Sequence, residues 1–227
     1  MEFLSQFISI LQLALEILLL FFLVFQQSLR SYLLLTLYCS VQLITSVLEV
    51  TVSRYAGNTS SRLYRNVYWT DEMVTDALLF LMVIAMIYRA TEGTNFRKPA
   101  ERLLSGVVTL ALLLPFVVFR QPYFTGHWFN GASQFLNFAA ALMNLVLWTA
   151  LLGTGKRDPQ LLTVSTGLGI SVTGAAIFYG LLTIFTTSVA LRMCYVLAHM
   201  ACLPIWCWAF RPSTAHNTAS ANVATTP

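Results

Sequence analysis

The stretch GASQFLNFAAALMNLVLWTALL, residues 131–152, contains no charged side chain over its whole length. A helix needs about 20 consecutive apolar residues to cross the hydrocarbon core of a bilayer, and this stretch is long enough. The backbone inside a bilayer must satisfy its own hydrogen bonds, which leaves only helices and closed barrels. Because the stretch is apolar on all faces, without the alternation of a barrel strand, it predicts a transmembrane helix.

Six further apolar runs of similar character flank this one. We expect spans at about residues 3–25, 32–52, 67–88, 103–119, 131–152, 161–185 and 188–210. The sequence therefore predicts an all-α integral membrane protein, a seven-transmembrane-helix bundle that occupies residues 1–211. The break between the last two spans depends on the polar residues Thr183, Thr186, Thr187 and Ser188, and without it there would be six spans. The tail at 212–227 is rich in Ser, Thr, Ala and Asn and is expected to be disordered.

The composition agrees with a membrane protein. Hydrophobic residues make up 57% of the chain and charged residues only 10%, against about 25% in a typical soluble domain. The formal net charge is +4, but the basic residues lie at the ends of apolar runs, so they indicate membrane topology. We expect the lipid bilayer as a partner and no nucleic acid.

The basic residues of the short loops predict an orientation, since cytoplasmic loops carry an excess of Lys and Arg. With the N-terminus outside, the cytoplasmic segments hold eight basic residues and the outer segments hold four: Arg54, Arg62, Arg65 and Arg120. The prediction is a multi-pass protein of the cell (inner) membrane with a cytoplasmic C-terminus.

Polar residues at helical spacing mark one face on five of the spans. An ionisable side chain inside a membrane is costly, and its presence suggests a function. We expect these faces to surround a cleft that opens outward and narrows toward Glu16 and His199. The candidate ligand-binding residues are Glu49, Glu72, Asp76, Asn137, Arg192 and His199. Glu16 and His199 are also candidates for a proton path.

Charge balance within the spans constrains this cleft. Arg192 is expected to pair with Asp76 or Glu72, and next with Glu49. The carboxylates still outnumber the cations, so some of them must be hydrated, protonated or matched by a bound cation. A structural interpretation stays open, because ion pairs and amide contacts also hold helix bundles together.

The sixth span carries small residues at four-residue steps, Gly167, Ser171 and Ala175, and then Ala176 and Gly180. Such spacing lets two helices approach closely, and we expect tight packing inside the monomer. The four cysteines lie in predicted spans without a C-x-x-C pair, and we expect buried thiols that act as small apolar residues.

Catalytic and cofactor motifs are missing from the sequence. Lys98 and Lys156 fall in loops, so no span offers a retinal Schiff base, and a single histidine in the membrane excludes bis-histidine haem. No H-E-x-x-H, G-x-S-x-G or clustered Cys/His set occurs. The sequence thus predicts no enzyme, no cofactor and no metal site.

The run Tyr68-Trp69-Thr70-Asp71-Glu72 resembles the Y-W-x-x-E element of small, uncharacterised seven-helix proteins found in acidobacterial genomes. The pattern around Tyr195, Trp206 and Arg211-Pro212 is also similar. The resemblance covers nearly the whole chain and implies a bacterial inner membrane.

Three interpretations of the function stay open. The leading one is a sensor-like or accessory protein that binds a small ligand or a membrane protein partner through the cleft. The second is a small transporter, coupled to protons or cations, that uses Glu16, Asp76 and His199. The third is a structural subunit of a membrane complex.

Overall fold

The computed structural model describes residues 2–26, 32–56, 62–92, 97–118, 125–153, 158–182 and 189–211. All regular secondary structure in these ranges is helical, as the sequence predicts. The seven helices are α1 (Glu2–Phe25), α2 (Leu33–Ala56), α3 (Arg62–Ala90), α4 (Arg97–Val118), α5 (Gly126–Gly153), α6 (Pro159–Leu182) and α7 (Val189–Ala209). Each apolar run of the sequence falls on one helix.

The sixth and seventh apolar runs form two helices that pack against each other, so the chain reverses between them. The polar residues on which that break depends, at 183–188, lie outside the described residues. The tail at 212–227 lies outside them as well, so its predicted disorder stays a prediction.

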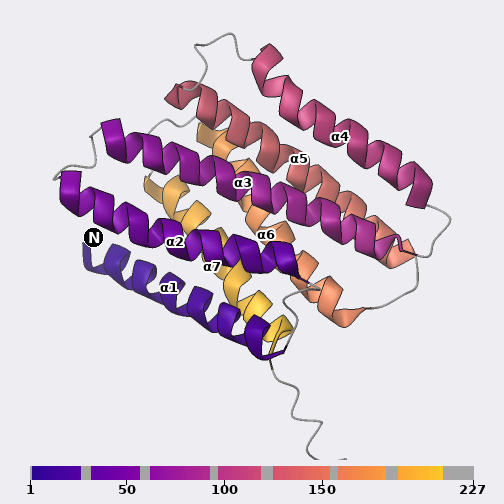
Figure 1. The fold of residues 1–227 in the computed structure, drawn as a ribbon, viewed down its shortest axis with the longest axis horizontal. Helices are drawn as coiled ribbons and strands as arrows, with labels where there is room; N and C mark the ends of the chain where they lie inside the picture. The colour runs from indigo at the N-terminus through magenta and orange to yellow at the C-terminus, as the bar shows by residue number, and fades with distance from the viewer. Residues whose placement is uncertain are drawn as a thin grey trace, which may run out of the picture.

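Six of the described helices form a closed ring, and α4 stands outside it. Around the ring α1 contacts α2, α2 contacts α3, α3 contacts α5, α5 contacts α6, α6 contacts α7, and α7 returns to α1. Consecutive helices run in opposite directions along one common slant (Figure 1). Helix α4 contacts only α3 and α5 among the described helices, and most of its large apolar side chains are exposed.

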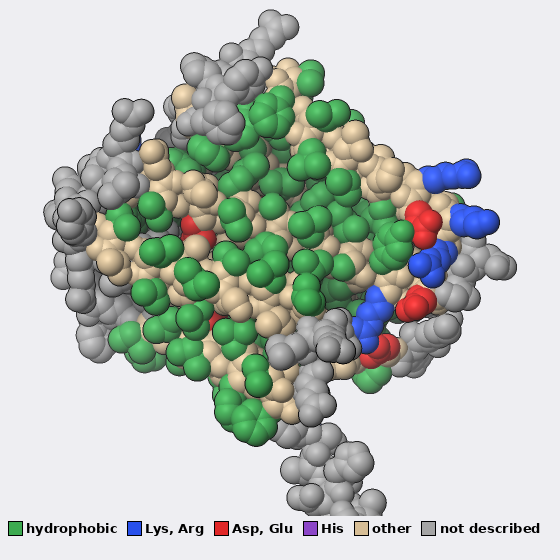
Figure 2. All heavy atoms as spheres, in the orientation of Figure 1, with side chains coloured by type: hydrophobic (Ala, Val, Ile, Leu, Met, Phe, Trp, Pro, Cys, Tyr) green, Lys and Arg blue, Asp and Glu red, His purple; other side chains and the backbone are tan. Residues whose placement is uncertain are grey.

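Four of the described helices, α3, α4, α5 and α6, are long and apolar enough to cross a membrane. The described parts of α1, α2 and α7 are apolar over shorter stretches. Apolar side chains cover the middle of the face drawn in Figure 2, and charged side chains gather at one end of it. The end of α3 and the start of α4 are rich in such charges, including an ion pair in which Arg97 Nε lies 3.1 Å from Glu101 Oε1.

The start of α6 is fixed by its cap. Asp158 Oδ1 accepts hydrogen bonds from the backbone N–H groups of Gln160 and Leu161, at 3.0 and 3.2 Å. These are among the amides that the first turn of a helix leaves unpaired, and aspartate is a preferred residue to satisfy them. Pro159 follows at the first helical position, where the missing N–H costs nothing.

Close packing of α6 on α7 depends on two glycines. A Cβ atom on Gly167 would lie 2.5 Å from Trp206 Nε1, and one on Gly174 would lie 2.5 Å from the Ala198 Cβ. The tight packing predicted from the small residues is therefore present inside the monomer. Ser171 and Ala175 line a cavity instead, and a Cβ atom on Gly180 would meet nothing within 4 Å.

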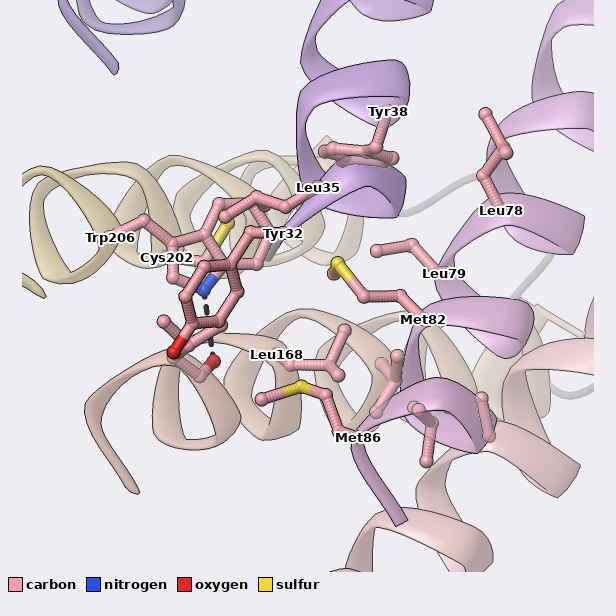
Figure 3. Close-up of a cluster of buried hydrophobic side chains, with 14 of the residues drawn as sticks. Tyr32, Leu35, Tyr38, Leu78, Leu79, Met82, Met86, Leu168, Cys202 and Trp206 are labelled. Atoms are coloured by element: carbon pink, nitrogen blue, oxygen red, sulfur yellow. Dashed lines mark hydrogen bonds between the residues drawn. The ribbon is translucent and has the colours of Figure 1, made fainter. Parts of the chain in front are cut away.

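Trp206 anchors the largest buried side-chain cluster. Its ring is fully buried, its Nε1 donates a hydrogen bond to the Val164 carbonyl oxygen at 3.0 Å, and its edge packs on Tyr38 with ring centroids 5.8 Å apart. Figure 3 shows Leu35 and Met82 pointing into the same cluster from α2 and α3. This apolar cluster, which we call the plug, fills the middle of the ring.

Candidate functional site

A cavity of about 610 Å³ lies inside the ring, next to the plug. Its walls come from α1, α2, α3, α6 and α7, and its size falls within the range of about 300–1,000 Å³ that is typical of small-molecule pockets. Ile10 and Val47 form one edge of the cavity, and both side chains are also more than half exposed on the outside of the bundle. We call this cavity the cleft.

Helix α3 supplies the acidic wall of the cleft. Glu72 and Asp76 share one face of the helix because they are four residues apart, and Asp71 lines the cleft from the position next to Glu72. The Thr75 hydroxyl donates a hydrogen bond to Asp71 Oδ1 at 3.4 Å, and the Tyr179 hydroxyl donates one to Glu72 Oε1. Two of the three carboxylates thus already receive a hydroxyl from a neighbouring side chain.

Asp76 lies deepest of the three and is only 3% exposed. The side chains of Ser133 and Asn137 on α5 are within hydrogen-bonding range of its carboxyl group. Its Oδ2 atom nevertheless has no hydrogen-bond partner among the described residues, and neither does Oδ1 of Asn137. Burying a polar oxygen without a partner costs free energy, so two such atoms at one place indicate a missing donor.

The floor of the cleft is a small polar network. Gln42 Nε2 lies 3.2 Å from His199 Nε2 and 3.4 Å from the Tyr38 hydroxyl, which itself lies 3.4 Å from His199 Nε2. An amide nitrogen only donates, so His199 accepts at Nε2 and carries its proton on Nδ1. Tyr38 then rests on Trp206 and joins the polar floor to the plug.

Glu16 belongs to a second network beside the floor. Gln12 lines the cleft and donates from Nε2 to Glu16 Oε1 at 2.9 Å, while Glu16 is 1% exposed. The Oε2 atom of Glu16 has no hydrogen-bond partner in the part of the chain that the structure describes. Within that part no hydrogen bond joins Glu16 to His199, so the two ends of the predicted proton path lie in separate networks.

A smaller cavity of about 220 Å³ lies on the other side of the plug. Tyr32, Met86 and Arg89 line it, and the Arg89 guanidinium stands 4.6 Å from the centroid of the Tyr32 ring.

Along α2 the small cavity is lined up to Leu35, Tyr38 of the plug follows, and the cleft begins at Gln42. Along α3 the cleft ends at Leu79, and Met82 of the plug already lines the small cavity. The plug therefore lies between the cleft with its acidic wall and the small cavity.

Among the described residues, no group of three His, Cys, Asp or Glu side chains is placed to hold a metal ion. No family model, no curated protein and no solved structure matches this chain. The cleft combines carboxylate and amide oxygens with aromatic and aliphatic walls. Such a surface is suited to binding a molecule that carries hydrogen-bond donors.

The predicted site residues fall into three groups. Glu72, Asp76 and His199 all line the cleft. Asn137 stands behind Asp76 and does not line it. The side chains of Glu49 and Arg192 lie outside the described residues, so the expected pairing of Arg192 stays a prediction.

The expectation that the fifth span would line the cleft is wrong. Asn144 and Trp148 line a separate shallow pocket on the other side of α6, where Asn144 packs against Gly169. Helix α6 takes the place of α5 in the wall, because its small residues leave room for the cavity. The cysteine prediction also needs a correction, since Cys39, Cys202 and Cys207 are buried but Cys194 is exposed.

Sequence reasoning missed Asp71, Ser133 and Tyr179 as site residues. Asp71 lies inside the Y-W-x-x-E element, and Ser133 precedes Asn137 by one helical turn, so both carried a signal in their spacing. Tyr179 continues the four-residue steps of Gly167, Ser171 and Ala175, but those small residues indicate helix packing and so did not mark it as a site residue.

Proposed function

We propose that this protein is a seven-span membrane protein of the cell membrane, with its N-terminus outside and its C-terminus in the cytoplasm, whose cleft binds a small ligand from the outer side. It acts as a sensor-like or accessory protein and passes the bound state to a partner through its basic cytoplasmic segments. The observation that carries the proposal is the carboxylate oxygen of Asp76, which lies at a cavity of ligand size and has no hydrogen-bond partner among the described residues.

Several features support the orientation. Exposed basic residues gather where α3 ends and α4 begins, which is the end that the loop charges assign to the cytoplasm. The cleft lies in the opposite half of the ring, beside Tyr68 and Asp71. A ligand that enters the cleft therefore comes from the outer side.

Cysteine labelling tests the topology in intact cells. With Cys194 replaced by alanine, a membrane-impermeant thiol reagent should label Arg65→Cys and should label neither Lys98→Cys nor Arg211→Cys until the cells are opened. All three positions are exposed and lie at helix ends. Labelling of Arg211→Cys from outside would contradict an odd number of spans, and labelling of Lys98→Cys would contradict the orientation.

Blocking the mouth of the cleft tests ligand binding. Val47→Trp should abolish the enrichment of at least one compound in equilibrium dialysis against a metabolite extract of the expressing cells, while the thermal stability stays near that of the unsubstituted protein. Ile44→Trp is the matched control, because Ile44 lies on the same helix at 57% exposure and does not line the cleft, whereas Val47 is 55% exposed and does.

The ligand proposal would be contradicted if the unsubstituted protein enriched no compound from the extract. It would also be contradicted if Val47→Trp enriched every compound that the unsubstituted protein enriches. Either result would leave the structural subunit as the better interpretation, in which the cleft is filled by a partner chain.

A carrier is the second candidate, and one observation favours it. Two cavities lie on opposite sides of the plug, along the same helices. A carrier would open them in turn, with Asp76, His199 and Glu16 as the groups that bind the coupled cation.

A further inference from the structure

We infer that the ligand of the cleft is a small organic cation whose ammonium group is bound by Asp76. The inference rests on the proposed function and specifies its ligand. Its first support is charge: Asp71, Glu72 and Asp76 line the cleft, and no Lys or Arg does so among the described residues. An anion would meet repulsion from the whole of this wall.

The second support is the distribution of hydrogen bonds among the three carboxylates. Asp71 and Glu72 each accept a hydroxyl from a neighbouring side chain, Thr75 and Tyr179 respectively. Asp76 is only 3% exposed, and its Oδ2 has no hydrogen-bond partner in the part of the chain that the structure describes. Asp76 is therefore the carboxylate most in need of a donor.

The third support is a second acceptor beside the first. Asn137 donates from Nδ2 to the Ser133 carbonyl oxygen at 3.0 Å, and its buried Oδ1 has no partner within the described ranges. This oxygen stands behind Asp76 and outside the lining of the cleft, so it adds a second buried acceptor to the surroundings of Asp76 without contacting the ligand. A primary ammonium group brings three N–H donors and a positive charge to Asp76, whereas an alcohol brings a single donor and no charge.

The fourth support is the space around Asp76. The cleft is far larger than a metal ion needs, and Leu13, Leu79 and Val196 supply apolar wall for the hydrocarbon part of a ligand. Tyr195 lines the same space and stacks on Phe178 with ring centroids 4.5 Å apart, which fixes its ring. An aromatic face near a cation adds attraction when both are shielded from water.

Binding of matched small probes to the purified full chain tests the inference. The probes are butylammonium and phenethylammonium, their neutral counterparts 1-butanol and 2-phenylethanol, the anion butyrate, and sodium ion alone. At least one ammonium probe should bind by calorimetry and raise the melting temperature, and its alcohol should bind about 100-fold more weakly, because truncating one partner of a buried charge pair costs several kcal/mol.

The variant Asp76→Asn removes the charge at nearly constant shape. It should weaken ammonium binding by about 100-fold or more. Its melting temperature without probe should equal or exceed that of the unsubstituted protein, because a buried carboxylate with an unpartnered oxygen costs more than an amide. The control Glu101→Gln, near the start of α4 and away from the cleft, should change neither the ammonium affinity nor the melting temperature.

Several outcomes would overturn the inference. They are equal binding of an alcohol or of butyrate, unchanged ammonium binding by folded Asp76→Asn, a lower melting temperature of that variant without probe, and an effect of sodium alone that ammonium probes do not reproduce. If Asp76→Asn does not fold, the preference of the unsubstituted protein for ammonium over its alcohol decides. If no probe binds, the test is the charge of the compound whose enrichment Val47→Trp abolishes. A cationic compound supports the inference. A neutral or anionic compound overturns it but leaves the proposed function intact.

Discussion

Replacing Trp206 with alanine should lower the free energy of unfolding by about 3–5 kcal/mol, the largest single effect expected in this protein. The indole ring is fully buried, and the substitution leaves a cavity in the plug that its neighbours can only partly fill. The loss of its hydrogen bond also leaves the Val164 carbonyl oxygen without this donor. The change should appear as a large drop in melting temperature of the purified protein in one detergent.

Trp208→Ala is the matched control for this prediction. Trp208 lies two residues further along the same helix, is 63% exposed and stands over the Arg211 guanidinium at 3.9 Å. Its removal should cost less than about 1 kcal/mol, in line with an exposed cation–π contact. Equal losses for the two tryptophans would show that the plug does not hold the ring together.

Replacing Gly174 with leucine should be the second most damaging change, with a loss of about 1–3 kcal/mol or more. Even a Cβ atom at this position would lie 2.5 Å from the Ala198 Cβ, which is attached directly to the backbone of α7. No rotamer can relieve that overlap, so α6 and α7 must move apart. Thermal unfolding of the purified protein in one detergent should report the loss of stability.

Gly106→Leu serves as the control for Gly174→Leu. Gly106 lies within α4, outside the ring, and a Cβ atom there would meet nothing within 4 Å. Leucine is also a better helix former than glycine, so this variant should be neutral or slightly more stable. A loss at Gly106 that matches the loss at Gly174 would argue against close packing as the cause.

The helices were predictable because each one coincides with a long apolar run in the sequence. A run such as 131–152 needs no knowledge of its neighbours to be identified. The arrangement of those helices was not predictable, since it depends on which faces meet. Nothing in the run at 103–119 shows that α4 stands outside the ring, because lipid and protein neighbours both accept leucine.

The candidate site was only partly predictable for a related reason. Helical spacing placed Glu72 and Asp76 on one face, and the structure brings both to the cleft with His199. Spacing gives the face of a helix but not the direction of that face within a bundle. Asn137 was therefore expected to line the cleft, although it stands behind Asp76 and supports that side chain.

The edge of the cleft that Ile10 and Val47 share with the outer surface has a thermodynamic consequence. In the proposed membrane arrangement this edge of α1 and α2 borders hydrocarbon, and the proposed ligand, an amphiphilic amine, would reach its site from solute dissolved in the lipid leaflet. The chemical potential of the amine in the leaflet depends on its partitioning between lipid and water as well as on its concentration in water. An association constant for such a solute thus has meaning only at a stated lipid content, and two laboratories with different bilayers would obtain different values from the same molecule.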